Sequence, residues 1–426
     1  MTTLLKNGTV FTPLGFERKD VFVSNGKLFV DSISSSDMNR ADRIIDCTNQ
    51  VIIPGFTDVH VHLREPGFFY KETIKSGTMA AARGGYTCVC TMPNLNPAPA
   101  DMQSLGQQLD IIERDAVVKV IPYGTITEQQ DGRSALSDME AMAPYVCAFS
   151  DDGKGVQAGE LMEEAMRKAK SLGKMIVAHC EDESLLFGGY IHDGAYARAH
   201  GHKGICSESE WGQVKRDAQL AEKTGCSYHV CHISAAETVD VIRAAKARGV
   251  DISCETGPHY LVLSDSDLEE DGRFKMNPPL RAASDKEALI AGIKDGTIDM
   301  IATDHAPHSA EEKAKGLADS AFGIVGLETS FPVLYTNLVK TGIISLEKLV
   351  ELMAVNPRKR FGLEGGCIED GAPADLTVID LNRRFTINPE DFLSMGKATP
   401  FAGWEVDGKV MITMVEGEIK YEETTA

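Results

Sequence analysis

The sequence VIIPGFTDVHVHLREPG spans residues 51–67 and guides the interpretation of the whole chain. Apolar residues dominate positions 51–63, which predicts a buried strand. Side chains two apart on a strand share a face, so His60 and His62 should point the same way, with Arg64 next if the strand continues. Two neighbouring imidazoles favour a divalent metal ion, and a guanidinium beside them suits a carboxylate on a ligand. An isolated pair of this kind is explained equally well by two core or surface histidines, so the rest of the sequence must decide.

Length and charge narrow the class of protein. A chain of 426 residues is too long for one ordinary core, which predicts one large domain with an appendage, or two domains. The 63 acidic residues outnumber the 43 lysines and arginines and give a net charge of -20, so nucleic acid is not expected as a partner. No apolar run approaches a membrane span and no signal pattern opens the chain, which predicts a cytoplasmic protein without membrane attachment. The ten cysteines form no CxxC pair and are expected to be reduced.

The two ends of the chain share a pattern of alternating apolar and polar residues that differs from the middle. Residues 4–53 alternate apolar and polar side chains, with turns predicted at Asn7-Gly8 and Asn25-Gly26. The same alternation returns at residues 374–379, 408–415 and 417–421. We therefore expect a small discontinuous β-sandwich domain made of residues 1–53 and 368–426.

The middle of the chain predicts a (β/α)₈ TIM barrel over residues 54–367. Helix-like stretches at residues 160–172, 211–224 and 235–248 lie between short apolar runs. The eight runs that we interpret as strands are residues 56–63, 86–92, 117–126, 146–150, 175–179, 227–233, 250–255 and 300–303. A doubly wound open sheet is the alternative, but no GxGxxG opens a helix.

Histidines and aspartates occur at the carboxyl ends of these predicted strands, where function is placed in such a barrel. Four histidines and two aspartates would make a nitrogen and oxygen shell suited to one or two zinc ions, whereas core histidines would be scattered along the strands. They are His60, His62, His179, His232, Asp304 and an aspartate of the Asp151-Asp152 pair. Cys180 and Cys231 adjoin two of the histidines, and strand alternation predicts that both thiols point away from the site.

Seven motifs give the chain a family resemblance that covers nearly its whole length. The chain resembles the bacterial class I dihydroorotases, within the metal-dependent amidohydrolases. Related hydantoinases, dihydropyrimidinases and allantoinases usually place a carboxylated lysine at the end of strand four, where this chain has Asp151-Asp152. The motifs are HVHLREPG (60–67), MPN (92–94), FSDDG (149–153), AHCED (178–182), CHIS (231–234), NPPLR (277–281) and TDHAPH (303–308).

The resemblance implies reversible cyclisation of N-carbamoyl-L-aspartate to L-dihydroorotate in pyrimidine biosynthesis, with two zinc ions per subunit. It implies His60, His62 and Asp304 around the first ion. His179 and His232 would hold the second ion, with Asp152 between the two. Asp151 is the alternative bridging residue. Asp304 is the expected catalytic residue, which takes a proton from water and passes it to the leaving nitrogen.

Six further residues are expected to bind the substrate. Arg64 is the expected clamp for the substrate carboxylate, and Asn94 and His308 add hydrogen bonds. The resemblance implies that Asn277, Phe322 and Gly323 also contact the substrate. An exposed salt bridge from Arg64 to Glu65 is the alternative for that arginine.

The resemblance leaves assembly and some details open. A homo-oligomer is expected, and so is an association with aspartate transcarbamoylase. A related cyclic amidase acting on another ring and a catalytically inactive scaffold protein are the competing functions. Residues 309–319 are either a mobile lid with Gly316 as a hinge or a solvated loop. The remaining histidines, among them His229 and His259, are expected to have structural or surface roles.

Overall fold

Strands from both ends of the chain join in one eight-stranded sheet. Its strand order is β17-β16-β15-β5-β1-β2-β3, and β4 pairs with β1. The computed structural model describes residues 2–33 and 41–424, so residues 1, 34–40 and 425–426 of the predicted terminal domain lie outside the described part. The strands are β1 (Thr3–Thr12), β2 (Gly15–Ser24), β3 (Lys27–Phe29), β4 (Arg43–Asp46), β5 (Val51–Pro54), β15 (Leu376–Thr386), β16 (Glu405–Val415) and β17 (Glu418–Glu422).

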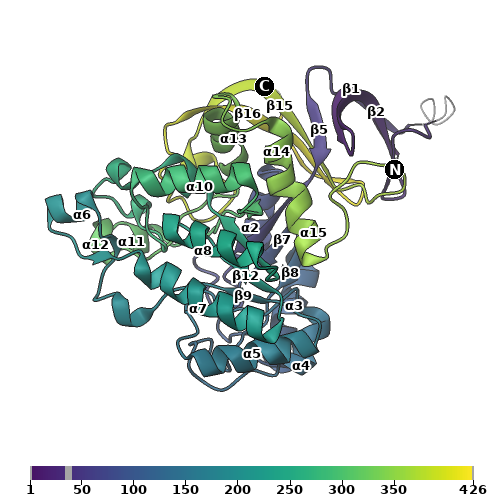
Figure 1. Ribbon diagram of the computed structural model, residues 1–426. Coiled ribbons are helices and arrows are strands. Elements are labelled where there is room, and N and C mark those ends of the chain that lie inside the picture. The colour runs from purple at the N-terminus through teal and green to yellow at the C-terminus, as the bar shows by residue number, and fades with distance from the viewer. Residues whose placement is uncertain (1, 34–40, 425–426) are drawn as a thin grey trace.

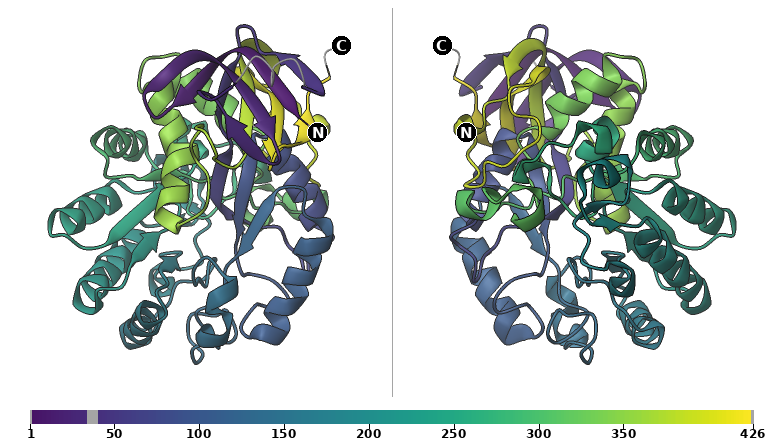
Figure 2. Two further views of the ribbon diagram at one scale, coloured as in Figure 1. Left: turned by 90° about the vertical axis from the view of Figure 1, so that its right-hand side faces the viewer. Right: turned by 90° about the vertical axis from the view of Figure 1, so that its left-hand side faces the viewer.

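The central contact of this sheet joins the two halves of the sequence. β5 and β15 are antiparallel neighbours, with Ile52 opposite Val378. Their side chains contribute to a buried apolar cluster that also contains Leu5, Val21 and Met414. Figures 1 and 2 show the purple N-terminal strands and the yellow C-terminal strands together at one end of the molecule, apart from most of the helices.

Asn7 and Gly8 do not form the turn that the sequence predicts. β1 continues through both residues, and its register with β2 shifts between Leu5 and Gly8. Asn7 has a φ of 63°, so this position is a bulge within the strand. Gly8 lets the Ile52 side chain pack closely, because a Cβ atom there would lie 2.5 Å from Cδ1 of Ile52 and that side chain would have to shift.

The turn predicted at Asn25-Gly26 is confirmed. Ser24 pairs with Lys27 across it, and Asn25 and Gly26 have φ values of 50° and 72°. Two consecutive positive φ values are typical of the tight turn that joins adjacent antiparallel strands.

The apolar run at residues 51–63 divides at Gly55. Its first part is β5. Its second part is β6 (Phe56–Val61), which belongs to a different sheet and pairs there with the strand at Tyr86–Thr91. A Cβ atom at Gly55 would lie 2.2 Å from Cγ2 and 2.7 Å from Cβ of Thr87, so glycine lets the Thr87 side chain pack closely against the backbone here.

The middle of the chain forms two larger parallel sheets and a two-stranded parallel one, in which β10 (Ile191–His192) pairs with β11 (Gly204–Ile205). The two larger sheets carry the site. One has the order β6-β7-β8 and the other the order β14-β13-β12-β9. Isolated parallel bridges link Phe149 to Gly124 and Ile176, and another links Val61 to His305. The remaining strands of these sheets are β7 (Tyr86–Thr91), β8 (Lys119–Pro122), β9 (Ile176–Ala178), β12 (Tyr228–Val230), β13 (Ile252–Thr256) and β14 (Met300–Ile301).

The strand predicted at residues 146–150 is reduced to the two bridges of Phe149. The reason lies in the next residues. The Asp151 carboxylate accepts hydrogen bonds from the backbone amides of Ile126 and Thr127, at 2.8 and 3.1 Å. A side chain thus binds amides that a longer strand would pair through its own backbone.

Helices surround the parallel strands, as the teal and green ribbons of Figure 2 show. The protein is therefore an α/β protein. The three helices predicted from the sequence are α5 (Gly159–Ser171), α7 (Glu208–Thr224) and α8 (Ala236–Ala247). The other α-helices are α2 (Ile74–Arg83), α3 (Met102–Asp115), α4 (Met139–Met142), α6 (Ala195–His200), α9 (Pro258–Val262), α10 (Ala283–Asp295), α11 (Ala310–Lys313), α12 (Gly316–Asp319), α13 (Ser330–Leu334), α14 (Leu346–Val350) and α15 (Asn356–Phe361). Within the described residues, no helix has the length and apolar character needed to cross a bilayer.

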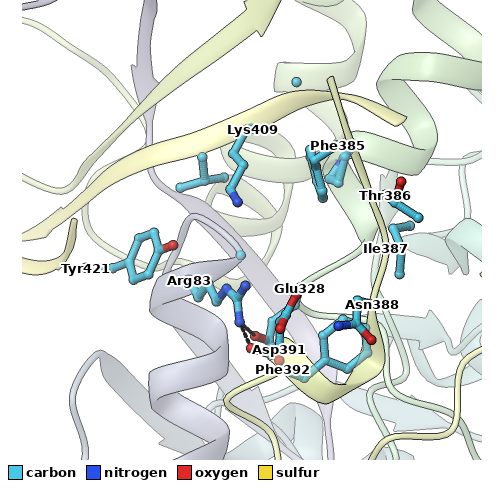
Figure 3. Close-up of a pocket in the computed structure, with 14 residues that line it drawn as sticks. Arg83, Glu328, Phe385, Thr386, Ile387, Asn388, Asp391, Phe392, Lys409 and Tyr421 are labelled. Carbon is cyan, nitrogen blue, oxygen red and sulfur yellow. Dashed lines mark hydrogen bonds and ion pairs between the residues drawn. The ribbon is translucent and has the colours of Figure 1, made fainter. Parts of the chain in front are cut away.

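A cavity of about 160 Å³ lies where α2 meets the C-terminal strands (Figure 3). Arg83 lines it and bonds to Glu328, with 3.3 Å between Nη1 and Oε1, and to the Asp391 carbonyl. Lys409, on another side, pairs with Glu423 at 3.0 Å. The cations at this junction are thus paired within the protein.

Candidate metal centre

The six predicted ligands lie together beyond the carboxyl ends of the parallel strands. All six side chains are buried. Their ligand atoms form two groups, each with all atoms within 4.8 Å of one another. The first group is His60, His62 and Asp304, and the second is Asp152, His179 and His232.

The first group has distances that suit a tetrahedral ion. Oδ1 of Asp304 is 3.1 Å from Nε2 of His62 and 3.6 Å from Nε2 of His60. Ligand atoms about 2 Å from a zinc ion lie about 3.3 Å apart in a tetrahedron. Burial alone would raise the pKa of Asp304, but the hydrogen bond with His62 and the nearby histidines bring that pKa to about 2. Asp304 is therefore ionised and able to ligate.

The second group adjoins the first through Asp152. Nδ1 of His179 is 3.0 Å from Nε2 of His232, and Oδ1 of Asp152 is 3.5 Å from that Nε2. The same Oδ1 is 3.3 Å from Nε2 of His60, and Oδ2 is 3.5 Å from Nε2 of His62. One carboxylate thus lies between both groups, as a bridging ligand must.

The donor set fits divalent metal ions. Nε2 of His60 and Oδ1 of Asp152 are buried and have no hydrogen-bond partner among the described residues. Buried polar atoms are normally paired, because an unpaired one loses its hydration without compensation. Imidazole lone pairs and carboxylate oxygens that converge in this way are satisfied together by shared cations.

The carboxylates of Asp151 and Asp152 make different contacts. Besides Ile126 and Thr127, the Asp151 carboxylate accepts from the amide of Gly132 at 3.2 Å and from the Thr127 hydroxyl. Its oxygens are therefore used in holding the loop at residues 126–132. The Asp152 carboxylate points into the ligand cluster.

A buried carboxylate and an amide orient the rings of His60 and His62 through the Nδ1 atoms. Nδ1 of His60 is 2.7 Å from Oε1 of Glu255, and Nδ1 of His62 is 2.8 Å from Oδ1 of Asn94. Both oxygens accept, so each Nδ1 carries the proton and each Nε2 presents its lone pair to the cluster. Oε2 of Glu255 also bonds to His229, at 3.0 Å from Nε2.

Glu255 and Asp58 are functional residues that the sequence analysis missed. Asp58 is fully buried and binds the amides of His60 and Thr303, at 3.0 and 3.1 Å, so it joins the two strand ends that carry ligands. The available signal was a charged side chain inside an apolar run, which requires a buried partner.

The prediction that the Cys231 thiol points away from the site is wrong. Its Sγ atom lies within 4.8 Å of the ligand atoms of His60 and Asp152. β12 ends at Val230, and His232 has a φ of 32°, so the alternation of a strand no longer applies there. The Cys180 thiol does lie elsewhere, 3.2 Å from the hydroxyl of Tyr228.

A cavity of about 200 Å³ opens beside the cluster. It is smaller than the roughly 300–1,000 Å³ of sites for drug-sized ligands, so a small molecule suits it. All six predicted substrate-binding residues line this cavity: Arg64, Asn94, Asn277, His308, Phe322 and Gly323.

Arg64 lies in this cavity wall without a carboxylate partner among the described residues. Its side chain is buried, and Nε donates to the carbonyl oxygen of Pro307 at 3.1 Å. The alternative salt bridge to Glu65 does not form, because Oε2 of Glu65 accepts from the amide of Ile74 at 2.8 Å. Arg64 has a φ of 64°, so the strand does not continue to it, and a left-handed turn brings it to the cavity.

Other parts of the wall are formed by segments that follow β9, β13 and β14. Nδ2 of Asn277 donates to Oε1 of Glu181 at 2.9 Å, and Oε2 of Glu181 lies 3.6 Å from Nε2 of His179. Gly323 has a φ of 134°, and a Cβ atom there would lie 2.6 Å from the carbonyl oxygen of Ala306. Glycine is therefore required where this segment borders the cavity.

Residues 309–319 form α11 and α12 beside this wall. The buried ammonium of Lys313 donates to the carbonyl oxygens of Lys275, Ala321 and Gly323, at 3.0, 2.8 and 2.7 Å. These bonds tie the segment to the cavity wall in this conformation.

Comparisons with known proteins agree with this geometry. A family model described as dihydro-orotase-like matches residues 49–238. The chain is 51% identical to the dihydroorotase of Fusobacterium nucleatum, over 98% of each chain. It is 49% identical to the dihydroorotase of Listeria innocua, over 99% of each. Among solved structures, an L-hydantoinase from Arthrobacter aurescens matches with a TM-score of 0.87 and 27% identity, over 98% of this chain and 95% of the other.

Proposed function

The chain belongs to the dihydroorotase family of metal-dependent cyclic amidohydrolases, and from that premise we propose how its residues interconvert N-carbamoyl-L-aspartate and L-dihydroorotate. The observation that carries the proposal is a buried Arg64 without a carboxylate partner, in the same cavity as the ligand cluster. A substrate carboxylate supplies the charge that this arginine lacks.

Two zinc ions per subunit are the cofactor that we propose. His60, His62 and Asp304 would hold one, His179 and His232 the other, and Asp152 would bind both. Zinc, when bound, lowers the pKa of a water molecule towards neutrality and polarises an amide carbonyl. The unpartnered Nε2 of His60 and Oδ1 of Asp152 support this assignment.

Asp304 is the residue that we propose for proton transfer. One of its oxygens lies 3.1 Å from His62, and the side chain lines the substrate cavity. In ring opening, its other oxygen accepts a proton from water and delivers it to the ring nitrogen that leaves. In ring closure, the same carboxylate takes the proton from that nitrogen.

Arg64, Asn94 and His308 would bind the substrate carboxylate, and Asn277 with the Phe322-Gly323 segment would contact the ring. Their common position in the cavity wall supports this role. The carboxylate group separates dihydroorotate from the uncharged rings of related cyclic amidases. A site built for a charged group should therefore reject a ring that lacks it.

The decisive assay compares turnover of dihydroorotate with turnover of dihydrouracil by the zinc-loaded protein. We expect a preference for dihydroorotate of at least about a hundredfold. A preference for dihydrouracil would instead support a cyclic amidase of the hydantoinase kind. Absence of turnover and of bound metal after zinc addition would favour an inactive scaffold.

Closure of the parallel strands into a (β/α)₈ barrel is also a proposal. The bridges at Phe149 and between Val61 and His305 support it, because they connect the two larger parallel sheets at both of their outer edges.

We further propose that residues 1–53 and 368–426 form a separate β-sandwich domain. The sheet shared by both ends of the chain and its own apolar cluster support this division. Limited proteolysis that leaves residues 54–367 as a stable fragment would support this division.

We also propose a homo-oligomer that associates with aspartate transcarbamoylase. The support is chemical, since that enzyme class produces the carbamoylaspartate that this reaction consumes. Light scattering and co-purification with the transcarbamoylase would test the two assemblies separately.

A further inference from the structure

Lys71 lies just outside the cavity and contacts one of its wall residues. Its Nζ atom is 3.2 Å from Nδ1 of His308 and 2.9 Å from Oε1 of Glu312. Only 14% of the side chain is exposed. The backbone links Lys71 to Arg64 through Phe68, because the Lys71 amide donates to the Phe68 carbonyl and the Phe68 amide donates to the Arg64 carbonyl.

The contacts of His308 define which ring nitrogen carries the proton. Nε2 is 2.7 Å from the carbonyl oxygen of Phe322, which can only accept, so Nε2 is protonated. Nδ1 faces the ammonium of Lys71, which can only donate, so Nδ1 is an unprotonated acceptor. The second neighbour of Nε2 is Nη2 of Arg64 at 3.3 Å, on the cavity side.

Glu312 also contacts the ring of His308, but it favours a proton on Nδ1. Its Oε2 atom is 3.4 Å from Nδ1 of His308 and would accept a proton held there. Without Lys71, this carboxylate would be the remaining charged neighbour of Nδ1. It would compete with the Phe322 carbonyl for the single ring proton and, as the charged acceptor, would favour the Nδ1–H tautomer. Burial, followed by the positive charges of Arg64 and Lys71, lowers the pKa of His308 to about 3, so the ring is neutral and only one nitrogen holds a proton.

We propose that Lys71 is a positioning residue that holds His308 in the Nε2–H tautomer, so that Nε2 donates to the Phe322 carbonyl and leaves Nη2 of Arg64 free to bind the substrate carboxylate. The inference rests on the proposed function, because it assumes that Arg64 binds that carboxylate. Lys71 itself does not line the cavity. Its effect therefore acts through the ring of His308 and through its ion pair with Glu312.

The tautomer can be observed directly by heteronuclear NMR of the zinc-loaded, substrate-free protein carrying isotope-labelled histidine. The His308 signals are identified by their loss in His308→Gln. We expect the Nε2–H pattern in the wild-type protein, the Nδ1–H pattern in Lys71→Met, and a return to Nε2–H in Lys71→Arg. In the double variant Lys71→Met/Glu312→Gln, the opposing carboxylate is gone and the shift should be weaker.

Kinetics provide the second measurement. Loss of a hydrogen bond to a charged group costs about 1.5–3 kcal/mol, so Lys71→Met should raise KM for dihydroorotate by roughly ten- to hundredfold, with a much smaller effect on kcat. Lys71→Arg should recover most of the affinity. Glu312→Gln is the matched control, and it removes the ion pair with Lys71 while keeping the Nε2–H tautomer.

An Nδ1–H pattern in the wild-type protein would overturn the proposal even if no Lys71 variant folds. So would an unchanged Nε2–H pattern in folded Lys71→Met. These outcomes are separate from failure of the proposed function, which would appear as absence of dihydroorotate turnover by the wild-type protein whatever the tautomer.

Discussion

Nδ1 of His60 lies 2.7 Å from Oε1 of Glu255, a residue 195 positions further along the chain. Glu255 is fully buried on β13, and His60 is on β6. Burial opposes ionisation of Glu255, but its hydrogen bonds with His229 and His60 bring its pKa to about 2. A permanent carboxylate behind the imidazole keeps the proton on Nδ1 and leaves Nε2 free for a metal ion.

Removing this carboxylate should weaken metal binding. We expect Glu255→Ala to lower zinc affinity by roughly ten- to hundredfold, measured by competition with a chelating dye. Glu255→Gln is the control for shape, since it retains an acceptor oxygen without the charge and should give a smaller loss. Unchanged zinc affinity in Glu255→Ala would show that the pair serves only packing.

Asp151 and Asp152 should respond differently to the same conservative change. Asp152→Asn should reduce zinc content and turnover by more than the effect of Glu255→Ala, because the carboxylate lies between both ligand groups. Asp151→Asn should retain zinc but lower the free energy of unfolding by about 1–3 kcal/mol, because amide hydrogens would then face the backbone donors of Ile126 and Thr127. Elemental analysis and chemical denaturation measure the two effects, and loss of zinc only from the Asp151 variant would reverse the assignment.

Replacing Arg64 should weaken substrate binding and leave zinc binding unchanged. Arg64→Ala should raise KM for dihydroorotate by roughly a hundredfold or more while zinc content stays near that of the wild type. Arg64→Lys keeps the charge but not the planar pair of donors, so it should recover only part of the affinity. Zinc loss from folded Arg64→Ala would mean that the arginine supports the metal site and not the substrate.

The sequence predicted the ligand cluster because its members occupy equivalent places in the chain. His60, His179, His232 and Asp304 each lie near the carboxyl end of a short apolar run, and parallel strands bring such positions together. Alternation along the strand predicted at residues 56–63 also placed His60 and His62 on one face, although β6 ends at Val61. These inferences need only strand direction and a side-chain period of two.

The remaining features depended on backbone turns and distant partners that no local pattern encodes. Cys231 entered the cluster because the chain leaves strand geometry after Val230. Glu255 and Asp58 have their partners far away in sequence. The bulge at Asn7 has the same dipeptide signature as the true turn at Asn25. The two are distinguished by the pairing of β1 with β2 on both sides of Asn7 and by the packing of Gly8 against Ile52.

Gly323 offers a sharp test of how the backbone shapes the substrate cavity. At its φ of 134°, an alanine would place Cβ 2.6 Å from the carbonyl oxygen of Ala306 and 3.1 Å from Cδ2 of His308. The segment would have to move, and with it the Phe322 carbonyl that accepts from His308. Gly323→Ala should therefore raise KM for dihydroorotate by roughly tenfold or more.

The matched control for this change is Gly316→Ala in the adjacent α12. Gly316 also has a positive φ, of 67°, but the nearest atom to a Cβ there is 3.9 Å away. Its alanine variant should lose only about 1–2 kcal/mol of stability, from backbone strain, and should leave KM nearly unchanged. Steady-state kinetics of the two variants, compared with their unfolding free energies, separate a local clash at the cavity from general strain. Equal effects on KM would show that the Gly323 backbone does not set the geometry of the binding site.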